Sequence, residues 1–146
     1  MKLRFAFAGF RHFHIVDLYE RVKCHPGCKI TLAVEEDAAA RAFAGENWGI
    51  ELTGNDYSGL RQEEFDVLAI GDCYGRRGAL AIGALEAGKH VISDKPICVS
   101  LDEWRRIRDL ADAKGLKVGC MLDLRDNGNV VAARQIVAGE IGRAHV

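Results

Sequence analysis

The fold is decided by the stretch LRFAFAG at residues 3–9, a short apolar run that is broken only by Arg4 and ends at a glycine. Directly after it, apolar side chains recur at helical spacing, at Ile15, Leu18, Tyr19 and Val22. This succession predicts a buried strand that turns at Gly9 into an amphipathic helix.

The rest of the chain repeats this alternation of apolar runs and helical patterns. We expect further strands at residues 29–34, 66–70, 90–93 and 117–122, and further helices at residues 37–44, 80–85, 100–113 and 128–138. Gly88 is expected to end the helix before it. Ser100 and Glu103 form a capping box, and the buried stripe of that helix is predicted at Trp104, Ile107, Leu110 and Ala111.

Apolar strands that alternate with helices are typical of a parallel sheet covered on both faces. Because crossover connections are right-handed, we expect a doubly wound, three-layer α/β fold that forms one domain over residues 1–146. In such folds ligands bind outside the carboxyl ends of the strands. The residues that follow each strand are therefore the candidates for a site.

Composition excludes several classes of protein. Hydrophobic residues make up 49% of the chain and charged residues 28%, which argues against disordered and fibrous proteins. The net charge of −1 argues against binding to nucleic acid or to an anionic membrane. No apolar run approaches the roughly 20 residues that span a bilayer, and the first run is too short for a signal peptide, so we expect a cytoplasmic protein.

The five cysteines are an odd number and are expected to be free, buried thiols: Cys24, Cys28, Cys73, Cys98 and Cys120. The segment CHPGC at residues 24–28 contains metal-ligating residue types. It has no second ligand pair, and Pro26-Gly27 is typical of the turn after a helix, so no metal site is expected.

The turn GFRHFH at residues 9–14 lies where a dinucleotide-binding fingerprint would begin. The fingerprint requires glycine at the positions of Gly9, Arg11 and His14, and only the first is glycine. Glu35 follows the second strand, about 20 residues further on, where a carboxylate binds the ribose hydroxyls. In the alternative interpretation Gly9 only makes a turn and residues 35–37 only begin a helix. Arg11 either pairs with a phosphate or blocks the site.

Two further strand ends carry charged loops. The segment GDCYGRR follows one strand at residues 71–77, and SDKP follows the next at residues 93–96. An acid, a lysine and a proline directly after a buried strand are expected at the ligand crevice, although an ordinary turn with a solvated lysine has the same composition.

The segment ALEAGKHVISDKP at residues 84–96 resembles the signature A-L-E-A-G-K-H-V followed by E-K-P of the glucose–fructose oxidoreductase and inositol dehydrogenase family, Gfo/Idh/MocA. Residues 101–113 and 122–125 are also similar to the N-terminal domain of that family, and residues 139–142 resemble its passage into the second domain. The resemblance implies a Rossmann domain that binds NAD and takes part in hydride transfer on a sugar, a polyol or a related alcohol. It places Lys95 beside the nicotinamide, where an ammonium stabilises an alkoxide and relays its proton, with Pro96 fixing the backbone.

The resemblance also implies roles for the other strand-end residues. The pyrophosphate turn would be lined by Gly9, Phe10, Arg11 and His12, and the next cofactor loop by Asp72, Cys73 and Arg77. Glu35 would favour NAD over NADP, because a carboxylate there repels a 2′-phosphate. Asp94 replaces the glutamate of the signature, Asp72-Cys73 replaces a usual Thr-Pro, and Arg77 replaces a common histidine. Since Arg11, Arg76 and Arg77 favour additional phosphate, NADP stays open.

The family has a second domain that carries substrate specificity, and the sequence stops at residue 146, where that domain would begin. His145 matches no catalytic position of the family. We therefore expect this chain to bind a dinucleotide without turning over a substrate. Residues 130–137 would be partly uncovered and could support self-association. Two alternatives remain: a non-catalytic sensor or interaction domain with a decayed cofactor site, and a domain for another nucleotide such as coenzyme A.

Overall fold

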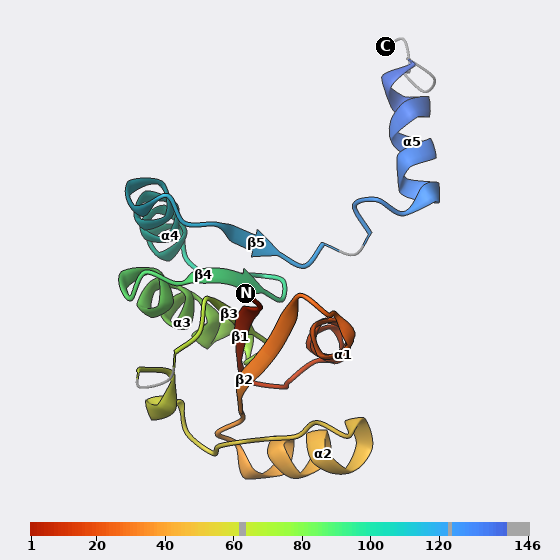
Figure 1. Cartoon of the computed structure of the whole chain (residues 1–146). Helices are drawn as coiled ribbons and strands as arrows, with labels where there is room; N and C mark the ends of the chain where they lie inside the picture. The colour runs from red at the N-terminus through yellow and green to blue at the C-terminus, as the bar shows by residue number, and fades with distance from the viewer. Residues whose placement is uncertain (62–63, 123, 140–146) are drawn as a thin grey trace.

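The computed structural model describes residues 1–61, 64–122 and 124–139. Within these ranges five strands form one sheet in the order β2-β1-β3-β4-β5 (Figure 1). Every neighbouring pair is parallel, which confirms the predicted sheet. The strands are β1 (Leu3–Ala8), β2 (Cys28–Val34), β3 (Val67–Ile70), β4 (His90–Ser93) and β5 (Val118–Cys120).

A short backbone pairing that the sequence analysis did not predict extends the sheet beyond β2. Val34 and Gly54 form an isolated parallel bridge. Beside it the Thr53 amide donates to the Ala33 carbonyl at 2.8 Å, and the Ala33 amide donates to Thr53 Oγ1 at 2.9 Å. Residues 53–54 thus take the place of the strand that lies outside β2 in a dinucleotide-binding sheet, and the complete order is that of the Rossmann fold.

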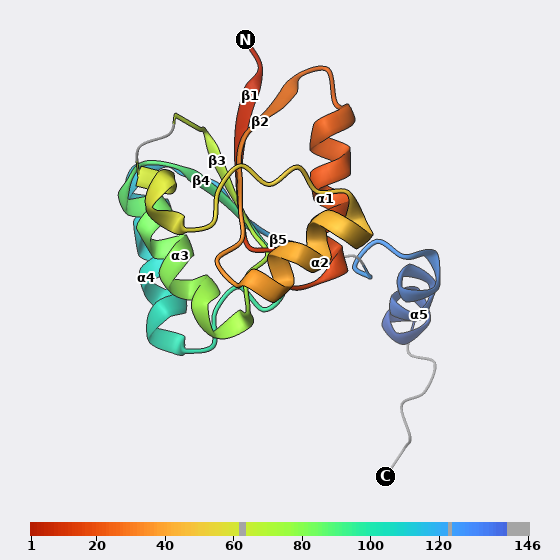
Figure 2. The same cartoon turned by 90° about the horizontal axis from the view of Figure 1, so that it is seen from below.

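Helices cover both faces of the sheet, as Figure 2 shows: α1 and α2 lie on one side, and α3 and α4 on the other. This arrangement confirms the doubly wound, three-layer fold. The helical elements are α1 (Phe13–Cys24), α2 (Ala38–Trp48), the 3-10 helix η1 (Tyr57–Arg61), α3 (Tyr74–Glu86), α4 (Leu101–Lys114) and α5 (Gly128–Ala138).

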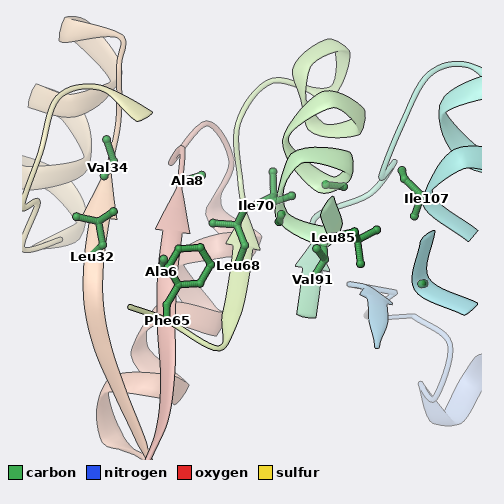
Figure 3. Close-up of a cluster of buried hydrophobic side chains, with 13 residues drawn as sticks. Ala6, Ala8, Leu32, Val34, Phe65, Leu68, Ile70, Leu85, Val91 and Ile107 are labelled. Carbon is green, nitrogen blue, oxygen red and sulfur yellow. The ribbon is translucent and has the colours of Figure 1, made fainter. Parts of the chain in front are cut away.

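Two hydrophobic clusters fill the spaces between the sheet and the helix layers. Because side chains of a strand alternate between its faces, Phe5 and Phe7 of β1 pack towards α1, and Ala6 and Ala8 pack towards α3 and α4. Figure 3 shows the second cluster, in which Leu85 of α3 and Ile107 of α4 meet the sheet. The continuous apolar runs are therefore explained by burial on both faces.

The predicted helix signals are present, with one correction. Ser100 Oγ accepts a hydrogen bond from the Glu103 amide at 3.1 Å, as the capping box requires, and Gly88 follows α3 with a φ of 75°. The predicted buried stripe of α4 is wrong at Trp104, which is 47% exposed. Its ring contacts the Arg108 guanidinium, whose central carbon lies 5.2 Å from the ring centroid.

The five cysteines all lie in the described residues, and all are free. The expectation of buried thiols is wrong for Cys24, which is exposed at the end of α1, and the other four are only partly buried. In the described parts of the chain, no helix is long and apolar enough to cross a membrane.

Helix α5 projects from the body of the domain (Figure 1). None of its residues is buried, and Ile136 and Val137 are 52% and 73% exposed. The uncovered apolar surface expected at residues 130–137 is therefore present. Residues 140–146 lie outside the described residues. They include His145 and all of the predicted 139–142 segment except Gly139.

Candidate functional site

The segments that follow β1, β2, β3 and β4 meet at one edge of the sheet, which we call the carboxyl edge. Main-chain hydrogen bonds join them: the Gly9 amide to the Val34 carbonyl at 2.8 Å, and the Arg11 amide to the Gly71 carbonyl at 2.9 Å. The Asp94 amide donates to the Ile70 carbonyl at 2.9 Å. The structure thus brings together the four segments that the sequence analysis singled out.

Gly9 is the one fingerprint glycine, and the structure shows why no other residue fits. Its φ is +84°, in the region that favours glycine, and a Cβ atom at this position would lie 2.5 Å from the Cα and N of Asp72. The turn after β1 therefore lies directly against the start of the loop after β3. This close approach fixes the entry of the chain into α1.

Phe10 contributes its backbone to the carboxyl edge, because its side chain is buried. The ring packs against those of Phe7 and Tyr19, with centroid distances of 6.0 and 5.8 Å. The Phe10 amide donates to Glu35 Oε2 at 2.7 Å.

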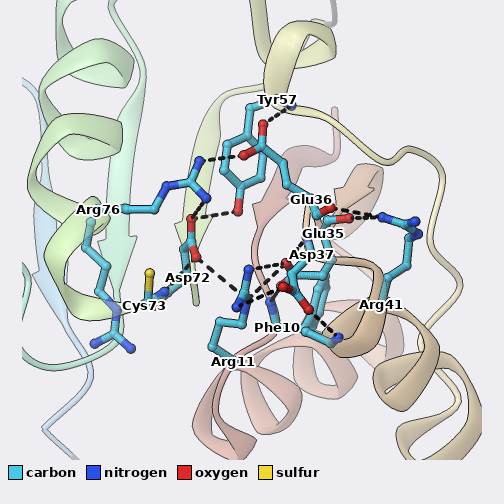
Figure 4. Close-up of polar contacts among 12 residues, drawn as sticks. Phe10, Arg11, Glu35, Glu36, Asp37, Arg41, Tyr57, Asp72, Cys73 and Arg76 are labelled. Atoms are coloured by element: carbon cyan, nitrogen blue, oxygen red, sulfur yellow. Dashed lines mark hydrogen bonds and ion pairs between the residues drawn. The ribbon is translucent and has the colours of Figure 1, made fainter.

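Glu35 is fully buried, and both of its oxygens are engaged (Figure 4). Oε2 accepts the hydrogen bond from the Phe10 amide. Oε1 accepts hydrogen bonds from Arg11 Nε and from the Asp37 amide, each at 2.9 Å. Arg11 Nη2 also lies 2.9 Å from Oε1. Burial alone would lower the pKa of Arg11, but the hydrogen bond and charge of Glu35 outweigh it and raise that pKa. The carboxylate thus ties the turn after β1 to the end of β2.

A second buried carboxylate, Asp72, organises the loop after β3. It accepts hydrogen bonds from the Tyr57 hydroxyl at 2.9 Å and from the Cys73 amide at 2.6 Å. Arg76 Nη1 lies 3.3 Å away, and Arg11 Nε lies 3.8 Å away. Burial, followed by the charge of Asp72, raises the pKa of Tyr57.

Arg76 and Glu36 extend this group of charges towards the surface. Arg76 Nη2 contacts Glu36 Oε2 at 2.5 Å, and Glu36 Oε1 accepts from the Tyr57 amide at 3.1 Å. Arg41 donates to the Glu35 and Glu36 carbonyls at 2.9 and 3.2 Å. Arginines and carboxylates therefore neutralise one another across the ends of β1, β2 and β3 (Figure 4).

Arg77 is buried and joins two loops. Its Nε donates to the Asp72 carbonyl at 2.6 Å, and Nη1 donates to the Lys95 carbonyl at 2.6 Å. Nη2 lies 3.1 Å from Asp94 Oδ2. All three guanidinium nitrogens thus contact protein oxygens, and Arg77 holds the loop after β4 against the loop after β3.

The signature loop after β4 lies beside the start of α1. His14 Nδ1 lies 3.2 Å from Asp94 Oδ1 and 3.1 Å from Lys95 Nζ, and the Lys95–Pro96 peptide is cis. Burial would raise the pKa of Asp94, but hydrogen bonds from the Lys95 amide and His14 and the charge of Arg77 hold it below its ordinary value. Asp94 is therefore a carboxylate at neutral pH.

Three side chains of this region have the spacing of a metal site. The potential donor atoms of His12, His14 and Asp94 lie within 4.8 Å of one another. However, Lys95 directly contacts His14, and Arg77 directly contacts Asp94. Two neighbouring cations oppose the binding of a third, so we assign no metal here.

A pocket of about 510 Å³ lies between η1 and α3, and it shares Tyr57 with the carboxyl edge. It is lined mainly by apolar side chains, and none of the predicted site residues is among them. We therefore place the candidate site at the carboxyl edge, where the charged side chains converge.

Sequence reasoning missed Tyr57, His14 and Arg41 at this edge. Tyr57 was not singled out, because nothing in the sequence shows that η1 brings it to Asp72. His14 was noted only as a lost glycine of the fingerprint. An ionisable residue at a position that normally requires glycine was the signal that could have revealed it.

A parallel sheet of Rossmann order, with a glycine turn that leads from β1 into a helix at the carboxyl edge, defines a nucleotide-binding α/β domain. The model of the oxidoreductase family with an NAD-binding Rossmann fold, GFO_IDH_MocA, matches residues 3–121. The chain belongs to this family, as the 84–96 signature indicated.

Relatives of the chain include YfiI, an uncharacterized oxidoreductase of Bacillus subtilis, which is 33% identical over 87 residues, 59% of this chain and 22% of that protein. Myo-inositol 2-dehydrogenase from Lactobacillus plantarum shares 22% identity with a TM-score of 0.77, over 97% of this chain and 43% of that one. Scyllo-inositol dehydrogenase from Lactobacillus casei, solved with NAD(H) and scyllo-inositol, shares 22% identity with a TM-score of 0.75 and the same coverage. The chain spans less than half the length of these relatives.

Proposed function

We propose that this chain is the dinucleotide-binding domain of an NAD-dependent oxidoreductase that acts on a sugar, a polyol or a related alcohol. The observation that carries the proposal is the meeting of Lys95 with the turn after β1, at a distance of 3.1 Å from His14 Nδ1. In a Rossmann fold this turn faces the pyrophosphate, so a lysine beside it is within reach of the nicotinamide half of the cofactor. When bound, the nicotinamide accepts or donates the hydride.

The residues of the turn fit a pyrophosphate. The first turn of α1 contains no acidic residue, so no carboxylate of the helix itself opposes an anion at the positive end of the helix dipole. We assign the pyrophosphate to the backbone of residues 9–12, with His12 at the start of the helix. Arg11, whose side chain is 27% exposed, is proposed to pair with a phosphate when it leaves Glu35.

Lys95 is the proposed catalytic residue. Its side chain is exposed, while its backbone is held by Arg77 and continues into Pro96. An ammonium on such a loop stabilises the developing alkoxide of a substrate and moves its proton. Asp72, Cys73, Arg77, Asp94 and Pro96 are proposed to shape the cofactor-facing loops on either side.

We propose NAD rather than NADP as the cofactor. Glu35, Glu36 and Asp37 follow β2 at the position that contacts the adenosine ribose, and this concentration of carboxylates repels a 2′-phosphate. Because Glu35 is buried and bonded to Arg11, the more exposed Asp37, at 47%, is the carboxylate nearest to solvent. Arg11 and Arg76 are already paired with carboxylates, which reduces their attraction for an additional phosphate.

Calorimetric titration of the 146-residue chain with NADH, and separately with NADPH, tests this proposal. We expect saturable binding of NADH and at least about tenfold weaker binding of NADPH, since one repulsive charge contact costs about 1.4 kcal/mol or more. Tighter NADPH binding would show that the arginines determine selectivity. Binding of neither would contradict the proposed function.

One observation favours the alternative of a non-catalytic sensor or interaction domain. Arg11, which replaces the second fingerprint glycine, pairs with Glu35 and lies near Asp72, so these charges are already satisfied within the protein. The variant Arg11→Gly restores the fingerprint glycine, and its titration with NADH distinguishes a dinucleotide-binding domain from a non-catalytic sensor or interaction domain. If neither the wild-type chain nor this variant binds NADH, the decayed-site alternative is supported.

A further inference from the structure

His14 occupies the position of the third fingerprint glycine, and its ring reaches across to the signature loop after β4. The side chain is only 12% exposed. Its Nδ1 atom lies between a carboxylate and an amine, 3.2 Å from Asp94 Oδ1 and 3.1 Å from Lys95 Nζ. One ring nitrogen therefore faces both a hydrogen-bond acceptor and a hydrogen-bond donor.

The chemistry of imidazole allows only one of these bonds at a time. A ring nitrogen either carries a proton, and can donate to Asp94, or carries a lone pair, and can accept from Lys95. Transfer of one proton onto Nδ1 therefore exchanges the Lys95 bond for the Asp94 bond. Asp94 is suited to the second state, because its carboxylate stabilises a ring that has just gained a proton.

We propose that His14 is the positioning residue of Lys95: the lone pair of its Nδ1 accepts a hydrogen bond from the Lys95 ammonium and holds that group beside the turn after β1. This inference rests on the proposed function and deepens it. Held in this way, the Lys95 ammonium stabilises the alkoxide that develops on a substrate.

The neighbouring groups do not offer Lys95 the same hydrogen bond. His12 Nδ1 accepts the His14 amide at 3.5 Å, which is the cap of α1, and it lies 3.7 Å from Asp94 Oδ2. Arg77, which also contacts Asp94, is permanently charged and cannot accept a proton. His14 is thus the group placed between Lys95 and Asp94 that can both lose and gain a proton.

Nitrogen-15 NMR of the uniformly labelled 146-residue chain tests the proposal without cofactor or substrate. At pH 8 we expect the lone-pair form of His14 Nδ1, and a shift of the proton to Nδ1 in Lys95→Met, because the Asp94 bond then has no competitor.

His14→Phe and His12→Phe form a matched pair of variants, since each replaces an imidazole by an apolar ring. Loss of the Nδ1 acceptor in His14→Phe should make the Lys95 amine protons exchange with water about tenfold faster or more, because a hydrogen bond from a charged group is worth about 1.5–3 kcal/mol. His12→Phe should leave that exchange unchanged. The backbone amide spectrum of each variant reports whether the fold is intact.

Two outcomes would overturn the proposal: a proton on Nδ1 in both the wild-type chain and Lys95→Met, or equal Lys95 exchange in the wild-type chain and a folded His14→Phe variant. Titration of the same samples with NADH tests the proposed function separately. If NADH binds but the Lys95 signal does not respond to His14, only the positioning role fails.

Discussion

Gly9 shows how a single residue determines whether the carboxyl edge can form. Its φ of +84° and the approach of the Asp72 backbone both exclude a side chain. We predict that Gly9→Ala lowers the free energy of unfolding by about 3 kcal/mol or more, through backbone strain and overpacking together. Urea denaturation followed by circular dichroism measures this loss.

Gly45 provides the matched control for this substitution. It lies inside α2, and a Cβ atom there would meet nothing within 4 Å. Gly45→Ala should therefore raise the free energy of unfolding by about 0.5–1 kcal/mol, because alanine loses less backbone freedom in a helix. Equal effects of the two substitutions would contradict the role assigned to the turn.

Glu35 is the second residue whose change has a predictable effect. A glutamine there keeps the shape but removes the charge opposite Arg11, and its amide NH₂ faces one of the donors that the carboxylate now accepts. We predict that Glu35→Gln lowers the free energy of unfolding by about 1–3 kcal/mol. Glu64→Gln, at an ion-paired carboxylate that is 88% exposed, should change it by less than about 0.5 kcal/mol. A comparable loss at both positions would show that burial of the carboxylate is unimportant.

At the scale of elements, β1 and β3 are joined by a side-chain contact in addition to their ladder. Asp66, directly before β3, accepts hydrogen bonds from the Arg4 amide at 2.8 Å and from Arg4 Nη2 at 2.8 Å. These bonds lower the pKa of Asp66 from 3.8 to about 2. Because the folded-state pKa is depressed, the stabilisation is complete above about pH 4 and is lost as the pH falls towards 2.

Asp66→Asn tests this linkage. The variant should be less stable than the wild-type chain at pH 7, and the difference should shrink between pH 4 and pH 2, where the wild-type carboxyl becomes protonated. Urea denaturation midpoints of the wild-type chain and the variant, measured over this pH range, give the comparison. A difference that stays constant down to pH 2 would mean that Asp66 acts through its shape rather than its charge.

The elements themselves were largely predictable, because each strand is buried on both faces and so forms an unbroken apolar run. The ends of β2 and β5 differ from the predicted 29–34 and 117–122 by one or two residues, since the last bonds of a strand depend on its neighbour. Residues 53–61 were not predicted, because a two-residue bridge and one 3-10 turn leave no periodicity. The exposure of Trp104 on α4 was not predictable, since helical spacing alone does not show that an arginine covers the ring.

At the scale of the whole molecule, the sheet and its four flanking helices form the folded unit, and α5 lies outside it. No residue of α5 is buried. We predict that truncation after Leu122 changes the free energy of unfolding by less than about 0.5 kcal/mol, because surface segments without packed contacts contribute little to stability. Urea denaturation of both chains gives the comparison, and a clearly lower midpoint for the shorter chain would show that α5 packs against the domain in solution.

The position of the site was predictable at this scale, but the hydrogen bonds and ion pairs between its side chains were not. A parallel sheet places strand ends together, so the sequence predicted that residues 9–14, 35, 71–77 and 93–96 would share one edge. It did not predict that Glu35 would bind Arg11, or that Arg77 would be buried, because those partners come from segments 18 or more residues apart. The roles of these residues towards a cofactor stay predictions until binding is measured.

Arg77 has a consequence for how the domain can move. Since one guanidinium bonds to carbonyl oxygens on both sides, the loop that carries Lys95 and the loop that begins at Asp72 are coupled mechanically to the first turn of α3. A displacement of Lys95 towards an incoming molecule would therefore carry α3 with it, whereas the surface side chain of Arg11 can reorient alone. Any adjustment on ligand entry is thus divided into a fast side-chain rotation on one side of the carboxyl edge and a slower rigid-body shift on the other.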